Sequence, residues 1–145
     1  MSSEQDLFNF DTMLCFSLYS TTNAMMRNYT QSLAQLGLTY PQLLVLIALW
    51  KQNHVSSSEL SQQTLFDLGS LSPIIKRLEK SGLVTITPDP NDRRRKYISL
   101  TQSGAKLKDP VSKIFADTQC KLNLSTLEID TMLKIGQKIK KQLKQ

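Results

Sequence analysis

The sequence predicts a mainly α-helical protein with one small β-hairpin. Apolar residues recur at helical spacing over most of the 145 residues, and apolar and polar residues alternate in two short segments on either side of a turn near residue 90. A chain of this length with 40% hydrophobic content is one globular domain by size. We therefore expect a single domain over residues 1–145.

Positive charge is concentrated in the second half of the chain. The formal net charge is +6, and residues 1–75 carry two cations against five anions, whereas residues 76–145 carry sixteen against seven. This distribution favours a polyanionic partner such as nucleic acid. The longest strongly apolar run, residues 43–50, is too short to span a bilayer, and the N-terminus has no signal-peptide pattern. We expect a cytoplasmic protein with no membrane partner.

A long helix is expected from Phe10 to Leu36, ended by Gly37. One of its faces follows the spacing of a single helical stripe, formed by Cys15, Tyr19, Thr22, Met26 and Tyr29. The stripe has two interpretations. It is either a core face in which the cysteine is a small buried hydrophobe, or a thiol site in which tyrosine hydroxyls donate hydrogen bonds to the sulfur.

Two shorter helices should follow. Residues 39–42 (Thr-Tyr-Pro-Gln) are a helix start that leads into the apolar run 43–50, which we place at the centre of the domain. Residues 56–59 fit a capping box and open a helix through about Gln63. The single histidine, His54, should be an exposed loop residue. With one histidine and two distant cysteines we expect neither a metal site nor a cofactor.

The next helix has a cationic outer face. Apolar residues at 71, 74, 75 and 78 form one buried stripe, and the preference of Pro73 for the first turn places the helix start between Asp67 and Leu71. Gly82 supplies the stop. The side chains left facing outward are Ser70, Ser72, Pro73, Lys76, Arg77 and Lys80.

The hairpin carries four consecutive cations. Residues 84–87 and 97–100 alternate as two half-buried strands, and the turn 88–92 between them is followed by Arg93, Arg94, Arg95 and Lys96. Because alternate residues of a strand share a face, we expect the Asp92 carboxylate to orient the Arg94 side chain. A helix-turn-helix pair followed by such a hairpin is a winged helix, here residues 55–101. It favours DNA contact over the alternative of a solvated basic turn.

The chain should end in two more helices. Thr101 can cap one that runs to about Lys121, and residues 125–128 form a capping box for the last helix. The apolar stripe of the last helix consists of Ile129, Met132, Leu133, Gly136, Ile139 and Leu143. A small domain has little to bury this stripe, so we expect residues 7–37 and 102–145 to form the interface of a homodimer. Its paired recognition helices would read a pseudo-palindromic operator with half-sites about 34 Å apart.

Several separate stretches resemble a known family. Residues 89–94 (Asp-Pro-Asn-Asp-Arg-Arg), followed by Ser-Leu-Thr at 99–101 and by Gly104, resemble the wing of the MarR family of dimeric winged-helix transcription regulators. Residues 14–20, 38–42 and 69–79 are similar to the OhrR type, the organic-hydroperoxide-sensing repressors of that family. The chain departs from that type at Leu68, Ser70 and Ser72, which bears on the operator sequence more than on the fold.

The resemblance implies a redox site built on Cys15, with Tyr19, Tyr29 and Tyr40 holding the thiolate. Tyr29 is about 21 Å along a straight helix from Cys15, so the Tyr29 that reaches it would have to come from an antiparallel partner helix. Cys120 resembles the second cysteine of the two-cysteine subgroup. That cysteine closes an intersubunit disulfide with the oxidised first cysteine. Until then both are reduced thiols.

The resemblance also implies DNA roles and an overall function. Arg94, oriented by Asp92, would enter the minor groove, within a DNA-binding set of Ser70, Ser72, Pro73, Lys76, Arg77, Asp92, Arg93, Arg94 and Arg95. The expected function is a repressor, not an enzyme, that releases its operator when an organic hydroperoxide oxidises Cys15 to sulfenic acid and a disulfide with Cys120 follows. Two alternatives remain: a MarR-type repressor that binds a small aromatic or amphipathic ligand, and a thiol peroxidase. The chain has neither a Cys-X-X-Cys motif nor a nucleotide loop, which argues against the peroxidase alternative.

Overall fold

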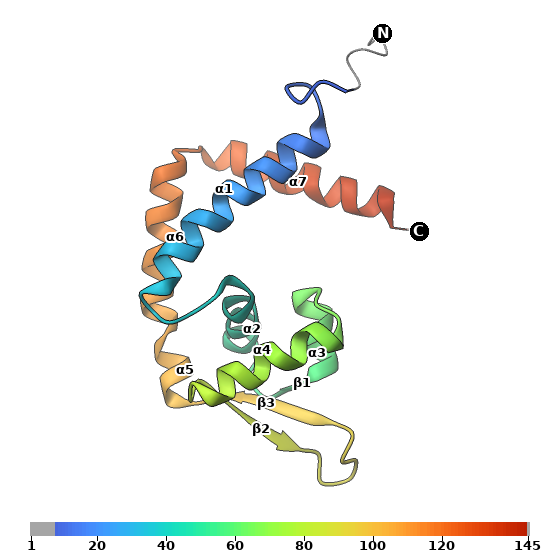
Figure 1. Ribbon diagram of the computed structural model, residues 1–145, viewed down its shortest axis with the longest axis vertical. Helices are drawn as coiled ribbons and strands as arrows, with labels where there is room; N and C mark the ends of the chain where they lie inside the picture. Colours follow the sequence, from blue (N-terminus) through green and yellow to red (C-terminus); the bar gives the residue numbers. More distant parts are fainter. Residues whose placement is uncertain (1–7, 145) are drawn as a thin grey trace. The chain divides into compact units, whose positions relative to one another are not determined.

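The computed structural model describes residues 8–144 of the chain, which divides into two compact units, Met1–Val111 and Ser112–Gln145. The predicted fold class is confirmed, because the chain is mainly helical with one small sheet. In order, the elements are α1 (Leu14–Ala34), α2 (Tyr40–Lys51), β1 (Val55–Ser56), α3 (Ser57–Thr64), α4 (Leu68–Lys80), β2 (Val84–Pro88), β3 (Lys96–Leu100), α5 (Gln102–Lys106), α6 (Lys108–Leu122) and α7 (Thr126–Leu143) (Figure 1).

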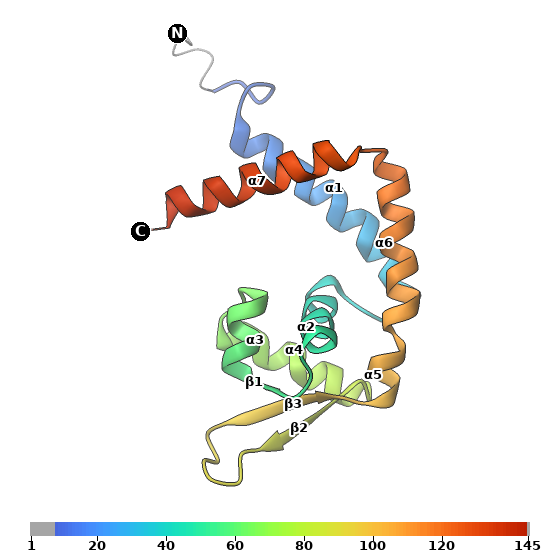
Figure 2. The same cartoon turned by 180° about the vertical axis from the view of Figure 1, so that it is seen from behind.

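The core of the first unit is built around α2. Leu43, Leu46 and Leu49 of this helix are completely buried, and α2 contacts α1, α3, α4 and β3. Figure 2 shows α2, α3 and α4 grouped beside the sheet, with β2 and β3 extending past them as a hairpin. The central position predicted for residues 43–50 is therefore confirmed.

Local hydrogen bonds explain the helix ends. Thr39, Ser56 and Ser125 are N-caps of complete capping boxes, in which the cap oxygen and the side chain three residues later bond each other's backbone amides. The predicted starts of α2, α3 and α7 are confirmed. At the end of α4, Gly82 adopts φ +72° and the Leu83 amide donates back to the Leu78 carbonyl at 3.0 Å.

The sheet has three antiparallel strands in the order β1-β3-β2. The two predicted strands are present as β2 and β3, with Ile86 opposite Ile98 and Thr87 opposite Tyr97. The sequence did not predict β1. It contributes only Val55 and Ser56, which is too short for an alternating pattern to be recognised.

Two predicted helices have different boundaries in the structure. The first begins at Leu14 rather than Phe10, because Asn9 forms a turn in which its carbonyl accepts the Thr12 and Met13 amides at 3.0 Å. The helix expected after Thr101 is two helices, α5 and α6. Pro110 has no N–H to donate to the carbonyl of Lys106, four residues back, and α5 ends at that residue.

The second unit leaves most of its apolar side chains exposed. Among the residues that the structure describes, α7 buries none of its side chains, and Leu127 is 76% and Leu133 60% exposed. None of the helices in the described part of the chain has the length and apolarity needed to cross a membrane. On the stripe predicted for α7, Met132, Leu133 and Leu143 are exposed, and Ile129, Gly136 and Ile139 are half-buried.

Gly104 packs α5 tightly against the base of the hairpin. The Trp50 indole N–H donates to the Gly104 carbonyl at 3.0 Å, and the Gly104 amide donates to Thr101 Oγ1 at 3.1 Å. A Cβ atom at this position would collide with the carbonyl oxygen of Leu83 and would lie 3.2 Å from the Leu100 side chain. The residue therefore has to be glycine for the two segments to approach this closely.

The substitution Gly104→Ala should destabilise the protein by about 1–3 kcal/mol, because the backbone of Leu83 must shift to admit the methyl group. Urea unfolding followed by circular dichroism measures the change. The control Ser103→Ala, at an exposed neighbour in the same helix, should stay within about 0.5 kcal/mol of wild type. Equal unfolding midpoints for the two variants would contradict the packing described.

Candidate nucleic-acid interface and thiol site

Asp67 determines where α4 begins. Its carboxylate accepts hydrogen bonds from the backbone amide of Ser70 at 2.8 Å and from the Ser70 hydroxyl at 2.9 Å. These bonds hold the pKa of Asp67 below its ordinary value, the Ser70 backbone amide being the largest cause. The predicted start between Asp67 and Leu71 is confirmed, although Pro73 is the sixth residue of α4 rather than a member of its first turn.

The outer face of α4 is cationic, as predicted. Leu71, Ile75 and Leu78 are buried, which turns the remaining side chains of the helix outward. The exposed positions on α4 include all of the predicted DNA-contacting residues of this helix: Ser70, Ser72, Pro73, Lys76 and Arg77.

Two aspartates organise the tip of the hairpin. Asp89 Oδ1 accepts the amides of Asn91 at 2.8 Å and Asp92 at 3.3 Å, and the Asp89 amide donates to the Arg95 carbonyl at 2.9 Å. Asp92 Oδ1 accepts the backbone amide of Arg94 at 3.0 Å. The expectation that Asp92 and Arg94 share a strand face is wrong, since both lie in the turn before β3, and Asp92 contacts the backbone of Arg94. Arg93, Arg94, Arg95 and Lys96 are all exposed.

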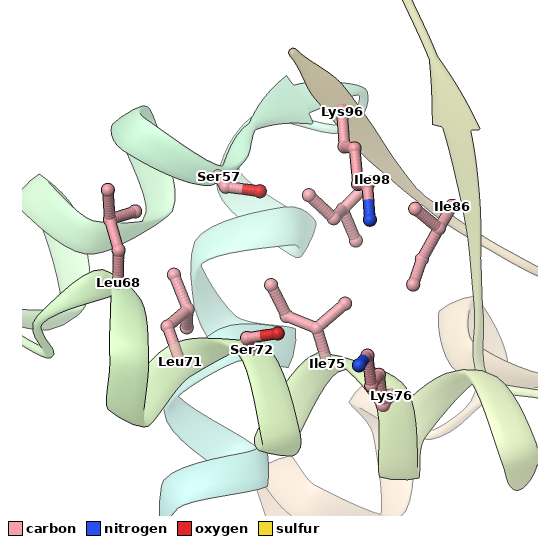
Figure 3. Close-up of a pocket in the computed structure, with 9 residues that line it drawn as sticks. All are labelled: Ser57, Leu68, Leu71, Ser72, Ile75, Lys76, Ile86, Lys96 and Ile98. Carbon is pink, nitrogen blue, oxygen red and sulfur yellow. The ribbon is translucent and has the colours of Figure 1, made fainter. Parts of the chain in front are cut away.

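A hollow of about 220 Å³ lies between α4 and the hairpin. Figure 3 shows Lys96 reaching in from β3 and Lys76 from α4, with Ile75, Ile86 and Ile98 between them. The sequence did not predict this hollow, because its lining comes from α3, α4, β2 and β3. Its lining places Lys96, to which the sequence assigned no role of its own, together with Lys76 of α4.

Both cysteines are exposed free thiols. Cys15 is the second residue of α1, and Tyr19, one turn later, is 64% exposed. The Phe16 ring lies 4.7 Å from that of Phe10 and 6.5 Å from that of Tyr19, measured between centroids. An aromatic cluster therefore borders Cys15 at the start of α1. Cys120 belongs to the last turn of α6, in the second unit.

The other two predicted tyrosines lie together elsewhere in the first unit. The rings of Tyr29 and Tyr40 are 5.5 Å apart, and Tyr29 is only 6% exposed. The structure thus brings together Tyr29 with Tyr40 at the junction of α1 and α2, and leaves Cys15 with Tyr19 at the other end of α1. The interpretation of the whole stripe as core is wrong within one chain, because the half that contains Cys15 is exposed.

His54 and Tyr97 form a contact that the sequence did not predict. His54 is exposed, as predicted, and its ring stacks on that of Tyr97 with centroids 4.9 Å apart and planes inclined by 10°. His54 lies in the loop just before β1 and Tyr97 lies in β3, 43 positions later in sequence, so no local pattern could have paired them. Within residues 8–144, no three His, Cys, Asp or Glu residues are grouped so that they could hold a metal ion.

Comparison with known proteins assigns the family. Residues 38–96 match the model of the MarR family. The chain is 37% identical over 109 residues to the organic hydroperoxide resistance transcriptional regulator of Bacillus subtilis (strain 168), and the alignment covers 75% of this chain and 74% of that protein. The chain belongs to the MarR family. It is a DNA-binding transcription regulator with the winged-helix fold that the resemblance implied.

Solved structures agree with this MarR-family assignment. Reduced AbfR bound to DNA aligns with a TM-score of 0.83 at 27% sequence identity, covering 97% of this chain and 96% of that one. AbfR in a disulfide-formed state aligns with a TM-score of 0.73 at 27% identity, covering 97% of each chain. One protein with this fold has therefore been seen both reduced on DNA and with a disulfide.

The stability that the Asp67 carboxylate gives to the start of α4 should be lost in acid. The variant Asp67→Asn should not show this pH-dependent loss. The pKa of Asp67 is lower in the folded chain, so its contribution is present above the ordinary aspartate pKa and is lost as the pH falls through and below about 4. Asparagine still accepts the Ser70 amide but does not titrate. Urea unfolding at pH values of about 5 and 3 should show a larger loss for wild type than for the variant. Parallel losses would show that Asp67 has no such role.

Proposed function

We propose that this MarR-family chain is a homodimeric repressor that binds a pseudo-palindromic operator and releases it when an organic hydroperoxide oxidises Cys15. Residues 55–101 are the DNA-binding part, and residues 7–37 and 102–145 are the dimerisation helices. The observation that carries the proposal is the exposed thiol of Cys15 beside the aromatic cluster of Phe10, Phe16 and Tyr19. A peroxide can reach this sulfur, and an apolar substituent can rest on the rings.

The chemistry is a two-electron oxidation of sulfur. The Cys15 thiolate attacks the terminal oxygen of the hydroperoxide, the O–O bond breaks, and the organic part leaves as the alcohol after it takes up a proton. The sulfur becomes a sulfenic acid. The thiol of Cys120 of the partner subunit then attacks that sulfur, forming the disulfide and releasing water. Each Cys15 reacts once until a reductant restores it, which separates a sensor from a thiol peroxidase.

The thiolate is held by phenol groups from two chains. Tyr19 follows Cys15 by one helical turn and donates from the same helix. Tyr29 is fourteen residues from Cys15, about 21 Å along α1, so the hydroxyls of Tyr29 and Tyr40 that complete the site come from the partner. The proximity of Tyr29 and Tyr40, with rings 5.5 Å apart, supports their acting as one group.

Dimerisation is supported by the apolar side chains that a single chain leaves uncovered. Leu127, Met132, Leu133 and Leu143 of α7 are all exposed, and a run of such residues on one helix is typical of a protein–protein interface. A two-fold dimer would present two copies of α4, spaced to meet successive major grooves of the operator.

Release of the operator follows from the geometry that a disulfide requires. The two Cα atoms of a disulfide lie within about 7 Å, so if the reduced Cys15 and the partner's Cys120 lie farther apart than this, closing the bridge must move the helices that carry them. Movement of those helices changes the spacing of the two DNA-binding parts and weakens binding. AbfR, solved both reduced on DNA and in a disulfide form, supports a switch of this kind.

A second candidate function is a MarR-type repressor whose inducer is a small amphipathic anion. The hollow between α4 and the hairpin favours it, because its lining combines the apolar side chains of Ile75, Ile86 and Ile98 with the side chains of Lys76 and Lys96. In that case Cys15 takes no part in induction. The cysteine variants described below distinguish this function from peroxide sensing.

The DNA assignments predict different effects for two cations. Arg94→Ala should weaken binding to a selected operator duplex by about tenfold or more, because an arginine in the minor groove is lost. Lys76→Ala should mainly reduce the slope of log K against log salt by about one, as expected for one phosphate contact. Fluorescence anisotropy over a salt series measures both quantities. Lys51→Ala, which removes a cation outside α4 and the hairpin, should match wild type, and three indistinguishable variants would refute the interface.

The sensor assignment predicts that Cys15→Ser binds the duplex normally but no longer releases it with cumene hydroperoxide. Cys120→Ser should still be oxidised at Cys15 but should form no covalent dimer. A DNA-shift assay measures release, and a non-reducing gel shows the covalent dimer. Release of the operator by Cys15→Ser as readily as by wild type would contradict the sensor and leave the ligand-binding alternative.

A further inference from the structure

Lys96 lies on the face of the hairpin that is turned toward α4. Alternate residues of a strand share a face, and Ile98, two positions after Lys96 in β3, is completely buried. Ile86, which pairs with Ile98 across the two strands, lines the same hollow as Lys96. Tyr97 belongs to the opposite face, where its ring stacks on that of His54. The side chain of Lys96 is therefore directed to the hollow between α4 and the hairpin.

Four polar side chains from three elements line this hollow. They are Ser57 of α3, Ser72 and Lys76 of α4, and Lys96 of β3. Figure 3 shows the Ser57 hydroxyl and the Lys96 ammonium group directed into one space, which Ser72 and Lys76 border from α4. In the part of the chain that the structure describes, none of these four groups takes part in a hydrogen bond or an ion pair within the protein. All four are free to donate to a ligand.

The charge of the hollow favours an anion. Lys76 and Lys96 bring two positive charges to the same space, and the described residues that line it include no aspartate or glutamate. Two ammonium groups that share a site repel one another, and an anion between them converts that repulsion into attraction. Lysine and serine side chains are also common donors to phosphate oxygens where proteins bind DNA.

The course of a DNA strand past the protein identifies this anion. One sugar–phosphate backbone separates the major groove from the neighbouring minor groove. With α4 in the first groove and Arg94 in the second, that backbone passes over the space between α4 and the hairpin, which is the place of the hollow. The phosphates of this backbone carry one negative charge each, so a phosphate facing the hollow would meet both lysines.

We propose that the hollow is the seat of one backbone phosphate of the operator, and that Lys96 binds this phosphate together with Lys76, Ser57 and Ser72. The proposal rests on the proposed function, because it requires α4 and Arg94 to enter neighbouring grooves. It gives Lys96 a role separate from that of the arginines at the tip. The seat also fixes the distance between the two grooves that the protein contacts, since its donors come from both α4 and the hairpin.

A salt series tests the role of Lys96. On a fluorescein-labelled duplex that the wild-type protein selects from a random pool, Lys96→Gln should weaken binding about three- to tenfold and reduce the slope of log K against log salt by about one. Ser57→Ala removes an uncharged donor, so it should weaken binding without changing the slope. The control Lys106→Gln, which removes an exposed lysine of α5 outside the hollow, should match wild type. A wild-type slope for Lys96→Gln would overturn the proposal.

Replacing single phosphates of the duplex by uncharged methylphosphonates locates the seat. At one phosphate, or at two adjacent ones, the replacement should weaken wild-type binding several-fold. On that duplex Lys96→Gln and Lys76→Gln should cause little further loss, because their shared anion is already absent. Arg94→Ala should still weaken binding there by its full factor. Lysine variants that lose their effect at phosphates several nucleotides apart would show that the two side chains share no seat.

The same variants separate failure of the seat from failure of the DNA-binding assignment. If Lys76→Gln and Arg94→Ala weaken binding but Lys96→Gln does not, the seat is refuted and the proposed interface stands. If all three bind like wild type, the interface itself is refuted and the seat with it. Urea unfolding midpoints equal to that of wild type are expected for every lysine variant, because these side chains are exposed.

Discussion

The packing of α4 onto the core is the constraint on which the DNA-binding surface depends. Leu71, Ile75 and Leu78 are buried where α4 contacts α2, α3 and β2. Burial of each such side chain contributes about 1.5–3 kcal/mol, so the helix cannot rotate about its axis without losing most of that stabilisation. The side chains that α4 presents to solvent, Lys76 and Arg77 among them, are therefore decided by the residues that it buries.

The same core also supports the hairpin. Val84 of β2 and Ile98 of β3 are buried, and at the base of the hairpin the carbonyl of Gly104 accepts a hydrogen bond from the indole of Trp50, a residue of α2. The recognition helix and the hairpin are thus held by one set of apolar contacts centred on α2. The two parts of the chain that are proposed to contact DNA are in this way kept at a fixed separation.

The sequence predicted those features that depend on neighbouring residues. Capping residues such as Ser56 and Asp67 determine helix starts through bonds to amides three positions away, and the stripe of α4 is visible as a simple repeat. It did not predict β1, the hollow at Lys96, or the stacking of His54 on Tyr97. Each of these depends on segments that are distant in the chain, and nothing in the local composition records them.

The thiol site shows a different limit of sequence analysis. Helical spacing correctly placed Cys15 and Tyr29 on one helix, but spacing shows only which residues share a face and not what covers it. In the structure the chain covers Tyr29 and leaves Cys15 exposed. The assignment of a partner to that exposed half therefore rests on the family and on the proposed dimer.

The hydrogen bond from the Ser70 hydroxyl to Asp67 has a consequence for the bases that α4 can select. Its single proton is already donated, so the oxygen can only accept. In the major groove the groups that donate are the exocyclic amines of adenine and cytosine. If Ser70 is among the residues that contact bases, as proposed, the base facing its oxygen would be adenine or cytosine, because guanine or thymine would oppose that oxygen with another acceptor.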